Sequence, residues 1–229
     1  MSDSLAPRSD YFIHLVETAQ GSAHALVVGA STADSDMKWQ MGGSAGAKLA
    51  APLRYLSNYI ESETLPDLLE NDGLLFVSER LRTALVPWLP AESEFVPAEV
   101  EYSNNKQTDE LGGARRVGGY WWLNSWRLVD AIDWDASQLV WRDRRGDQGR
   151  HASSPVRAIG WKQLVLMPDA IEAEHFFGLA GIYGARRFLS PKLHAHLLDF
   201  GFRLHFKPEF LGPPTISPYK LSTTLNRRR

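Results

Sequence analysis

The chain has 229 residues, 44% of them hydrophobic, with no cysteine and a formal net charge of −2. A chain of this length buries about 70% of its unfolded surface, so its core needs no covalent staple. The missing cysteines exclude a disulfide framework and thiolate metal sites, and the charge argues against a dedicated nucleic-acid-binding protein.

The N-terminal residues predict where the protein resides. Residues 1–10 are polar and lack the basic and apolar regions of a signal peptide. No apolar run approaches the roughly 20 residues that cross a bilayer. We therefore expect a cytoplasmic protein that does not associate with membranes or nucleic acid.

The first half of the chain shows weak β-signals and two short helical signals. Residues 11–17 and 25–28 are β-favouring and flank a turn, which predicts a hairpin. Residues 29–48 are rich in Gly, Ser and Ala and predict a long loop. We expect a short helical or irregular piece at Leu53–Ile60 and a helical turn at Leu65–Leu69 that ends at residues 71–73.

Two helices carry clear capping signals. Ser78 is an N-cap, and Pro87 is expected to end or kink the helix that follows it. Ser190 is a second N-cap, Pro191 occupies the first helical position, and Gly201 suits the C′ position. The apolar residues at helical spacing are Leu81, Ala84, Leu85 and Trp88 in the first helix and Leu193, Leu197 and Leu198 in the second.

Strands are more numerous than helices. Residues 96–102 alternate between apolar and polar side chains, which predicts a half-buried strand, and Pro97 favours an edge position. Further strands are predicted at residues 120–123, 126–132 (as part of one bent strand or as a second strand), 139–141, 163–167 and 202–206. Because the strands do not alternate with helices, we expect an α+β fold with mainly antiparallel sheets and a few short capped helices.

The domain organisation follows from this pattern. We expect flexible residues 1–10, one domain over residues 11–210 and a loosely ordered, proline-containing tail at 211–229. A division of the domain into two lobes near residues 145–155 stays open.

Two glycine-rich stretches resemble nucleotide-binding loops and fail in detail. The Walker motif needs a glycine before its lysine and Ser or Thr after it, whereas Ala47 precedes Lys48 and Leu49 follows. The glycines of residues 178–184 have the wrong spacing for a dinucleotide site. We interpret the first stretch as a flexible loop and the second as turns or close backbone packing.

No side-chain pattern predicts catalysis, a metal or a cofactor. His194 and His196 lie two apart on a predicted helix and point to different faces. The acidic residues around Trp134, which are Asp130, Asp133 and Asp135, are also typical of a turn. We therefore expect no enzyme, although a site that assembles only in the fold remains an alternative.

A basic segment leaves a third function open. Arg142, Arg144, Arg145 and Arg150 follow Trp141, and arginine beside an aromatic ring is a nucleic-acid-binding composition. Asp143 and Asp147 dilute this charge, so we favour a solvated loop over a small-ligand or nucleic-acid site.

Three stretches in order resemble a bacterial immunity-protein family of polymorphic toxin systems. They are Leu65–Asp67 with Leu75–Leu81, then Glu94–Pro97 with Tyr120–Asn124 and Val129–Ser137, and finally Phe188–Ser190 with the strand after Gly201. The resemblance covers about Leu65 to Phe206. It implies a cytoplasmic antidote that binds and blocks a cognate toxin and has no catalytic residues.

Aromatic residues in the first part of the chain are the predicted toxin contacts. Trp39 lies in a polar loop, and Tyr55 and Tyr59 are four apart on the expected helical piece. Trp and Tyr are common anchors of protein interfaces. The alternative, in which all three pack over the core, stays open.

Overall fold

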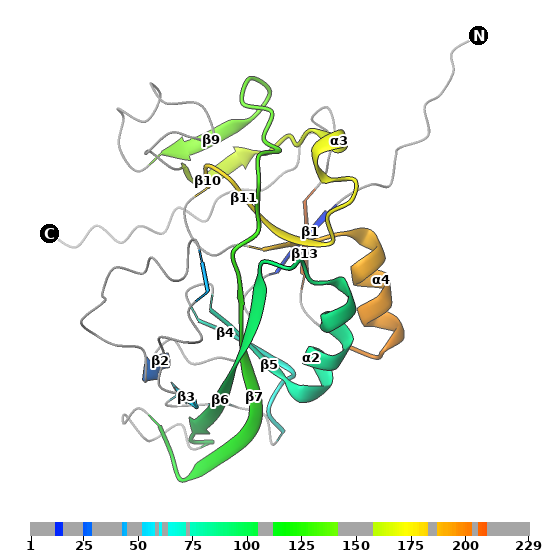
Figure 1. Ribbon diagram of the computed structural model, residues 1–229. Coiled ribbons are helices and arrows are strands. Elements are labelled where there is room, and N and C mark those ends of the chain that lie inside the picture. Colours follow the sequence, from blue (N-terminus) through cyan, green and yellow to red (C-terminus); the bar gives the residue numbers. More distant parts are fainter. Residues whose placement is uncertain are drawn as a thin grey trace, which may run out of the picture.

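The protein is described from a computed structural model, which shows β-sheets packed against short helices (Figure 1). The structure describes residues 12–15, 25–28, 43–44, 52–57, 60, 64–71, 74–104, 112–141, 158–182, 187–202 and 206–209. The helical elements among them are α2 (Glu79–Leu85), the 3₁₀ turn η3 (Val86–Trp88), α3 (Pro168–Ile171) and α4 (Pro191–Asp199).

The largest sheet has six strands in the order β2-β3-β6-β7-β5-β4. Its strands are β2 (Ala25–Val28), β3 (Leu53–Ser57), β4 (Leu68–Asn71), β5 (Leu74–Ser78), β6 (Ser93–Tyr102) and β7 (Arg115–Ser125). All neighbours pair antiparallel except β3 and β6.

A second sheet has five strands in the order β13-β1-β12-β11-β8. Its strands are β1 (Phe12–Leu15), β8 (Leu128–Val129), β11 (Phe176–Leu179), β12 (Phe188–Leu189) and β13 (Phe206–Glu209). A separate pair consists of β9 (Gln138–Trp141) and β10 (Ala158–Gln163). Since antiparallel pairs dominate and the helices are short, the predicted α+β class is confirmed.

The first predicted hairpin is wrong. β1 pairs with β12 and β13, whereas β2 pairs with β3 in the other sheet. Both segments are correctly predicted as strands, but their partners lie far away in sequence. Pairing of this kind leaves no local signal.

The two short helical pieces are also wrong, because β3 occupies most of the first and β4 begins at Leu68 within the second. In β3 the side chains alternate between buried and half-buried, which is the period of a strand. β4 and β5 form a hairpin whose register, Asn71 opposite Leu74, leaves only Asp72 and Gly73 for the connection. Asp-Gly between two apolar runs is a strong hairpin signal, and here it outweighs the helical turn expected to end at residues 71–73.

Pro97 does not mark an edge, because β6 lies between β3 and β7. The pairing of β6 with β3 begins at Ala98, one residue after Pro97. The proline therefore sits just outside that ladder, where its missing N–H costs no hydrogen bond to β3.

Two later strand predictions are displaced. β10 ends at Gln163, where the predicted strand 163–167 begins, and Leu166 makes only an isolated bridge with Ile132. Phe202 belongs to the turn after α4, β13 begins at Phe206, and residues 203–205 lie outside the described part of the chain.

The core is built on both faces of the six-stranded sheet. One face buries Tyr55, Phe76 and Trp122. The other face joins α2, α4 and strands of the five-stranded sheet in one cluster, which includes Leu81, Phe176, Leu193 and Leu197. A third cluster lies under β9 and β10 and includes Phe177 and Phe188. The second cluster fixes α2 and α4 against both sheets.

Polar contacts join the two large sheets where β7 leads into β8. The buried Arg187 side chain donates to the carbonyl of Ser125, and burial lowers the pKa of Arg187 to about 10. Arg127 donates to Glu174 at 2.5 Å and to Glu92 at 3.3 Å. The crossing between the sheets is therefore held by two arginines.

Candidate functional site

α2 begins where its capping residue is itself held in place. The Ser78 hydroxyl oxygen accepts from the Leu81 amide at 3.2 Å and donates its hydrogen to Asp67 at 2.5 Å. Leu81, Ala84 and Leu85 form the buried stripe, as predicted. After Leu85 the helix continues as the 3₁₀ turn η3, which contains Pro87.

α4 has the predicted start and end. The Ser190 hydroxyl accepts from the Leu193 amide at 3.1 Å, and Pro191 follows. At the other end Gly201 adopts a φ of 79°, and the amides of Gly201 and Phe202 donate to Leu198 and Leu197. This is the Schellman arrangement, in which glycine accepts a left-handed conformation. Leu198, which was predicted to be part of the buried stripe, is 50% exposed.

α2 and α4 lie side by side and cap each other (Figure 1). Arg80 in the first turn of α2 donates from Nη2 to the carbonyl of Phe200 at 2.6 Å. His196 in the last turn of α4 donates from Nε2 to the carbonyl of Ala84 at 3.2 Å. Residue 87 would donate to the Ala84 carbonyl in a 3₁₀ turn, and proline has no N–H with which to do so.

This reciprocal capping makes the two helices one antiparallel unit. The guanidinium of Arg80 also lies 4.1 Å above the centre of the Phe202 ring. A carbonyl at a helix end normally needs water or a side chain as its partner. Here each helix supplies a donor to the other, so the surface between them is formed before any partner arrives.

Four rings form a continuous row across this unit, from His175 through Trp88 and His196 to Phe200. The distances between successive ring centres are 4.9, 5.0 and 4.7 Å. Phe200 is 53% exposed, and the other three rings are half-buried. We name this set the aromatic row.

His175 connects the aromatic row to the start of α4. Its Nδ1 lies 2.8 Å from the Ser190 hydroxyl oxygen, which already accepts from the Leu193 amide. A neutral imidazole therefore suits the site, because it accepts the remaining hydroxyl hydrogen. Burial, and secondarily the charge of Lys192, lower the pKa of His175 against an opposing effect of Glu174.

The other flank of α2 carries a stacked arginine. The Arg82 guanidinium lies 4.2 Å from the Trp121 ring centre and 5.3 Å from that of Phe95. Glu79 accepts hydrogen bonds from Arg82 and from the Trp121 indole. The surface of α2 is thus ordered on both sides.

A family model for an immunity protein family, Imm11, matches residues 19–208. The chain belongs to this immunity protein family. The match confirms the resemblance seen over Leu65–Phe206 and extends it toward the N-terminus. It includes α2, η3 and α4, and so the whole aromatic row. A comparison with curated proteins finds no match.

Of the three predicted toxin contacts, the structure describes only Tyr55. Tyr55 is 1% exposed on β3, its ring centre is 4.9 Å from that of Phe76, and burial raises its pKa to about 12. It is a core residue in this conformation, which is the alternative left open. Trp39 and Tyr59 lie outside the described residues.

The rejected chemical motifs have structural roles where they are described. The Asp133 carboxylate accepts from the amides of Asp135 and Ala136, as expected of a turn. Gly181 has a φ of 86°, and a Cβ there would lie 2.4 Å from the Trp134 ring. Close packing against the Trp134 ring therefore requires glycine at position 181. The segment Arg142–Arg150 lies outside the described residues.

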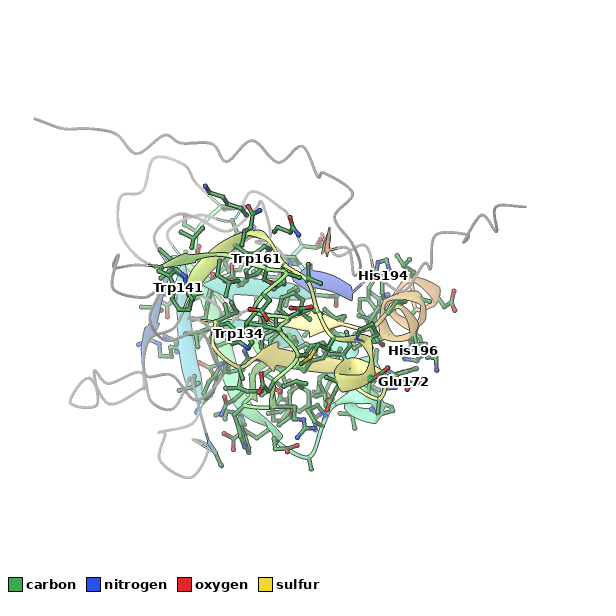
Figure 2. All side chains as sticks on the ribbon, turned by 90° about the horizontal axis from the view of Figure 1, so that it is seen from above. Trp134, Trp141, Trp161, Glu172, His194 and His196 are labelled. Carbon is green, nitrogen blue, oxygen red and sulfur yellow. The ribbon has the colours of Figure 1, made fainter. Side chains whose placement is uncertain are left out.

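The predicted helix places His194 and His196 on α4, away from the tryptophans Trp134, Trp141 and Trp161 (Figure 2). Within the described ranges, no three His, Asp or Glu side chains are grouped so as to hold a metal ion. Nor does any helix in that part of the chain have the length and apolar character to cross a membrane.

The aromatic row was missed because its members come from three separate segments. Trp88 and His196 were each noticed, one as a helical apolar position and one in a histidine pair. The signal that joins them is Pro87, whose missing N–H leaves a carbonyl that needs a donor from elsewhere.

Proposed function

We propose that this protein neutralises a cognate bacterial toxin by binding it in the cytoplasm, as part of a polymorphic toxin system. Membership of an immunity protein family supports the role. The mechanism we propose is occlusion by protein–protein contact, without a chemical step by this chain.

We infer that the aromatic row is the centre of the contact surface. Tryptophan is the residue type most enriched among interface hot spots, and such residues lie near the centre of the interface. Trp88 stands between two other rings, and Phe200 exposes about half of its surface. The exposed Val86, at 51%, adds apolar area at the end of α2.

The reciprocal capping of α2 and α4 supports this choice. A surface that is ordered before binding loses little side-chain entropy on association, which leaves more of the contact energy for affinity. Charged groups, including Arg80, Lys192 and Asp199, lie at the two ends of the row. An apolar centre with a polar rim is the usual anatomy of an interface.

Co-expression with a candidate toxin gene found beside this gene tests the role. We expect cells that carry both genes to survive and cells that carry the toxin alone to die. Equal death in the two cultures would overturn the proposed function.

A matched pair of variants tests the surface. Phe200 and Leu198 are both large, apolar and about half exposed, at 53% and 50%, and two positions apart on a helix they face opposite sides. We expect Phe200→Ala to weaken toxin binding by about tenfold or more and Leu198→Ala by less than about twofold. Binding is measured by calorimetry with an inactive toxin variant. Equal effects of the two substitutions would exclude the aromatic row as the contact.

A further inference from the structure

The first half of β7 is a strand with an open side. β5 pairs with β7 only from Leu75 opposite Leu123 to Ser78 opposite Tyr120. β6 continues along β7 as far as Tyr102 opposite Arg115. After Ser78 the chain leaves the sheet as α2, so no described strand follows Arg115–Gly119 on that side. We name Arg115–Gly119 the open edge.

The open edge is accessible along its whole length. All five of its residues are exposed, whereas Tyr120 and the next alternate positions toward Ser125 are buried. In Figure 1 this part of β7 sweeps to the lower rim of the molecule. Unpaired N–H and C=O groups on an exposed strand are a template for another strand.

Two glycines, Gly118 and Gly119, leave the backbone without side-chain cover at the end of the open edge next to Tyr120. Ala98 lies opposite Tyr120 and Val100 opposite Val117, so Gly118 and Gly119 together face Glu99 in a β-bulge. Gly119 has a φ of 77°, and a Cβ on either glycine would meet no atom within 4 Å. Glycine inside a strand often marks a place where another backbone approaches closely.

The arginines of the open edge indicate the charge that a segment bound there should carry. Arg116 donates to Glu101 at 2.9 Å, and Glu101 also binds Arg54 at 2.5 Å. Arg115, the next residue, is exposed and has no ion-pair partner among the described side chains. An incoming strand with a carboxylate opposite Arg115 would gain a cross-strand pair, whereas a basic strand would be repelled.

We propose that the open edge binds an extended, acidic segment of the toxin as an additional antiparallel or parallel strand of the six-stranded sheet. This inference rests on the proposed function and adds a second point of contact to it. Ser78 and Tyr120 lie opposite each other where α2 begins, so the open edge and the aromatic row flank the same helix. One partner can therefore reach both.

A second copy of this chain is a poorer occupant. Its own open edge carries Arg115 and Arg116 and no carboxylate. Pairing two such edges would bring like charges together without supplying a carboxylate to Arg115, which has no ion-pair partner among the residues that the structure describes. The toxin segment supplies that charge.

Hydrogen exchange on the full chain, alone and with an inactive toxin variant, tests the inference. We expect those amides of residues 115–119 that point away from β6 to exchange more slowly in the complex, because strand addition pairs them directly. Unchanged exchange there in a complex that forms and neutralises would overturn the open edge and leave the proposed function standing. Failure of the wild-type chain to bind or neutralise would overturn both.

Charge variants provide the second measurement. We expect Arg115→Glu to weaken toxin binding by about tenfold and Arg115→Lys by less than about threefold, since lysine keeps the charge. Lys162→Glu, the same reversal on the exposed face of β10, is the matched control. Equal losses for Arg115→Glu and Lys162→Glu would contradict the inference. So would protection of residues 115–119 from exchange in the absence of toxin, if that protection increased with protein concentration, because it would indicate pairing between two copies of this chain.

Discussion

The α2–α4 unit and the first half of β7 differ in whether their backbone polar groups have partners within the described chain. In the helix pair, the carbonyls of Ala84 and Phe200 receive donors from the neighbouring helix. Along the open edge of β7, no described strand pairs with the side that faces away from β6. The helix pair is therefore a finished, largely apolar surface, whereas the open edge offers polar backbone groups that a partner can complete.

This difference implies different contributions to binding. A preformed ring surface contributes affinity through burial of apolar area, and its order is set by the core beneath it. An open strand contributes through hydrogen bonds whose register selects the partner. The first should be sensitive to core packing under α4, and the second to backbone conformation at the glycines.

The largest expected effect comes from removing the core contact that holds α4. Leu197 is 1% exposed, whereas its neighbour Leu198 is 50% exposed. We expect Leu197→Ala to lower the free energy of unfolding by about 2–5 kcal/mol, because it leaves a cavity in the core. Leu198→Ala should change it by about 0.5 kcal/mol or less. Urea denaturation measures both, and similar losses would show that α4 does not pack as described.

A smaller effect separates the two glycines of the open edge. Gly119 has a φ of 77°, whereas Gly118 lies outside the positive-φ region, and neither position has a neighbour that a Cβ would strike. We expect Gly119→Ala to cost about 1–2 kcal/mol of stability through backbone strain alone. Gly118→Ala should cost clearly less. Equal costs in thermal unfolding would contradict the bulge geometry.

The smallest effect concerns acid stability at the aromatic row. The folded-state pKa of His175 is lowered, so the unfolded chain takes up the proton first as the pH falls. The stabilising contribution is complete above the unfolded-state pKa of about 6.5 and is lost as the pH falls through the lower folded-state pKa. We expect wild-type unfolding free energy to decrease over this window.

His175→Asn tests this assignment, because its side-chain amide can still contact Ser190. We expect the free energy of unfolding to depend less steeply on pH between about pH 7 and pH 5 in the variant. Part of the remaining dependence comes from His194, because burial also lowers its pKa. An unchanged slope in denaturation at the two pH values would exclude His175 as the titrating group.

Several elements were predictable because their signals are local. Ser78 and Ser190 each place a hydroxyl within reach of an amide three residues later, and Gly201 accepts the left-handed turn that ends α4. The alternation in residues 96–102 likewise produces a strand whatever its neighbours are. The α+β class follows from the balance of such segments.

Strand partners and the candidate site depended on contacts between distant residues. Residues 53–60 were expected to be helical or irregular, yet β2 and β6 hold β3 as a strand through pairs that no local pattern encodes. The expected exposure of Tyr55 failed for the same reason, since burial is decided by what packs above a residue.

The sequence by itself determined the helix caps, the turn at Asp133, the absence of cysteine chemistry and the family resemblance. Only the tertiary structure decided which strands pair and how far β7 extends beyond its pairing with β5. It also decided that His196 donates to the carbonyl of Ala84, beside Pro87. The physical reason is one of range. Caps and turns satisfy backbone groups within a few residues. The aromatic row and the open edge exist only because segments far apart in the sequence come together, and the contact between Arg80 and Phe200 spans 120 residues.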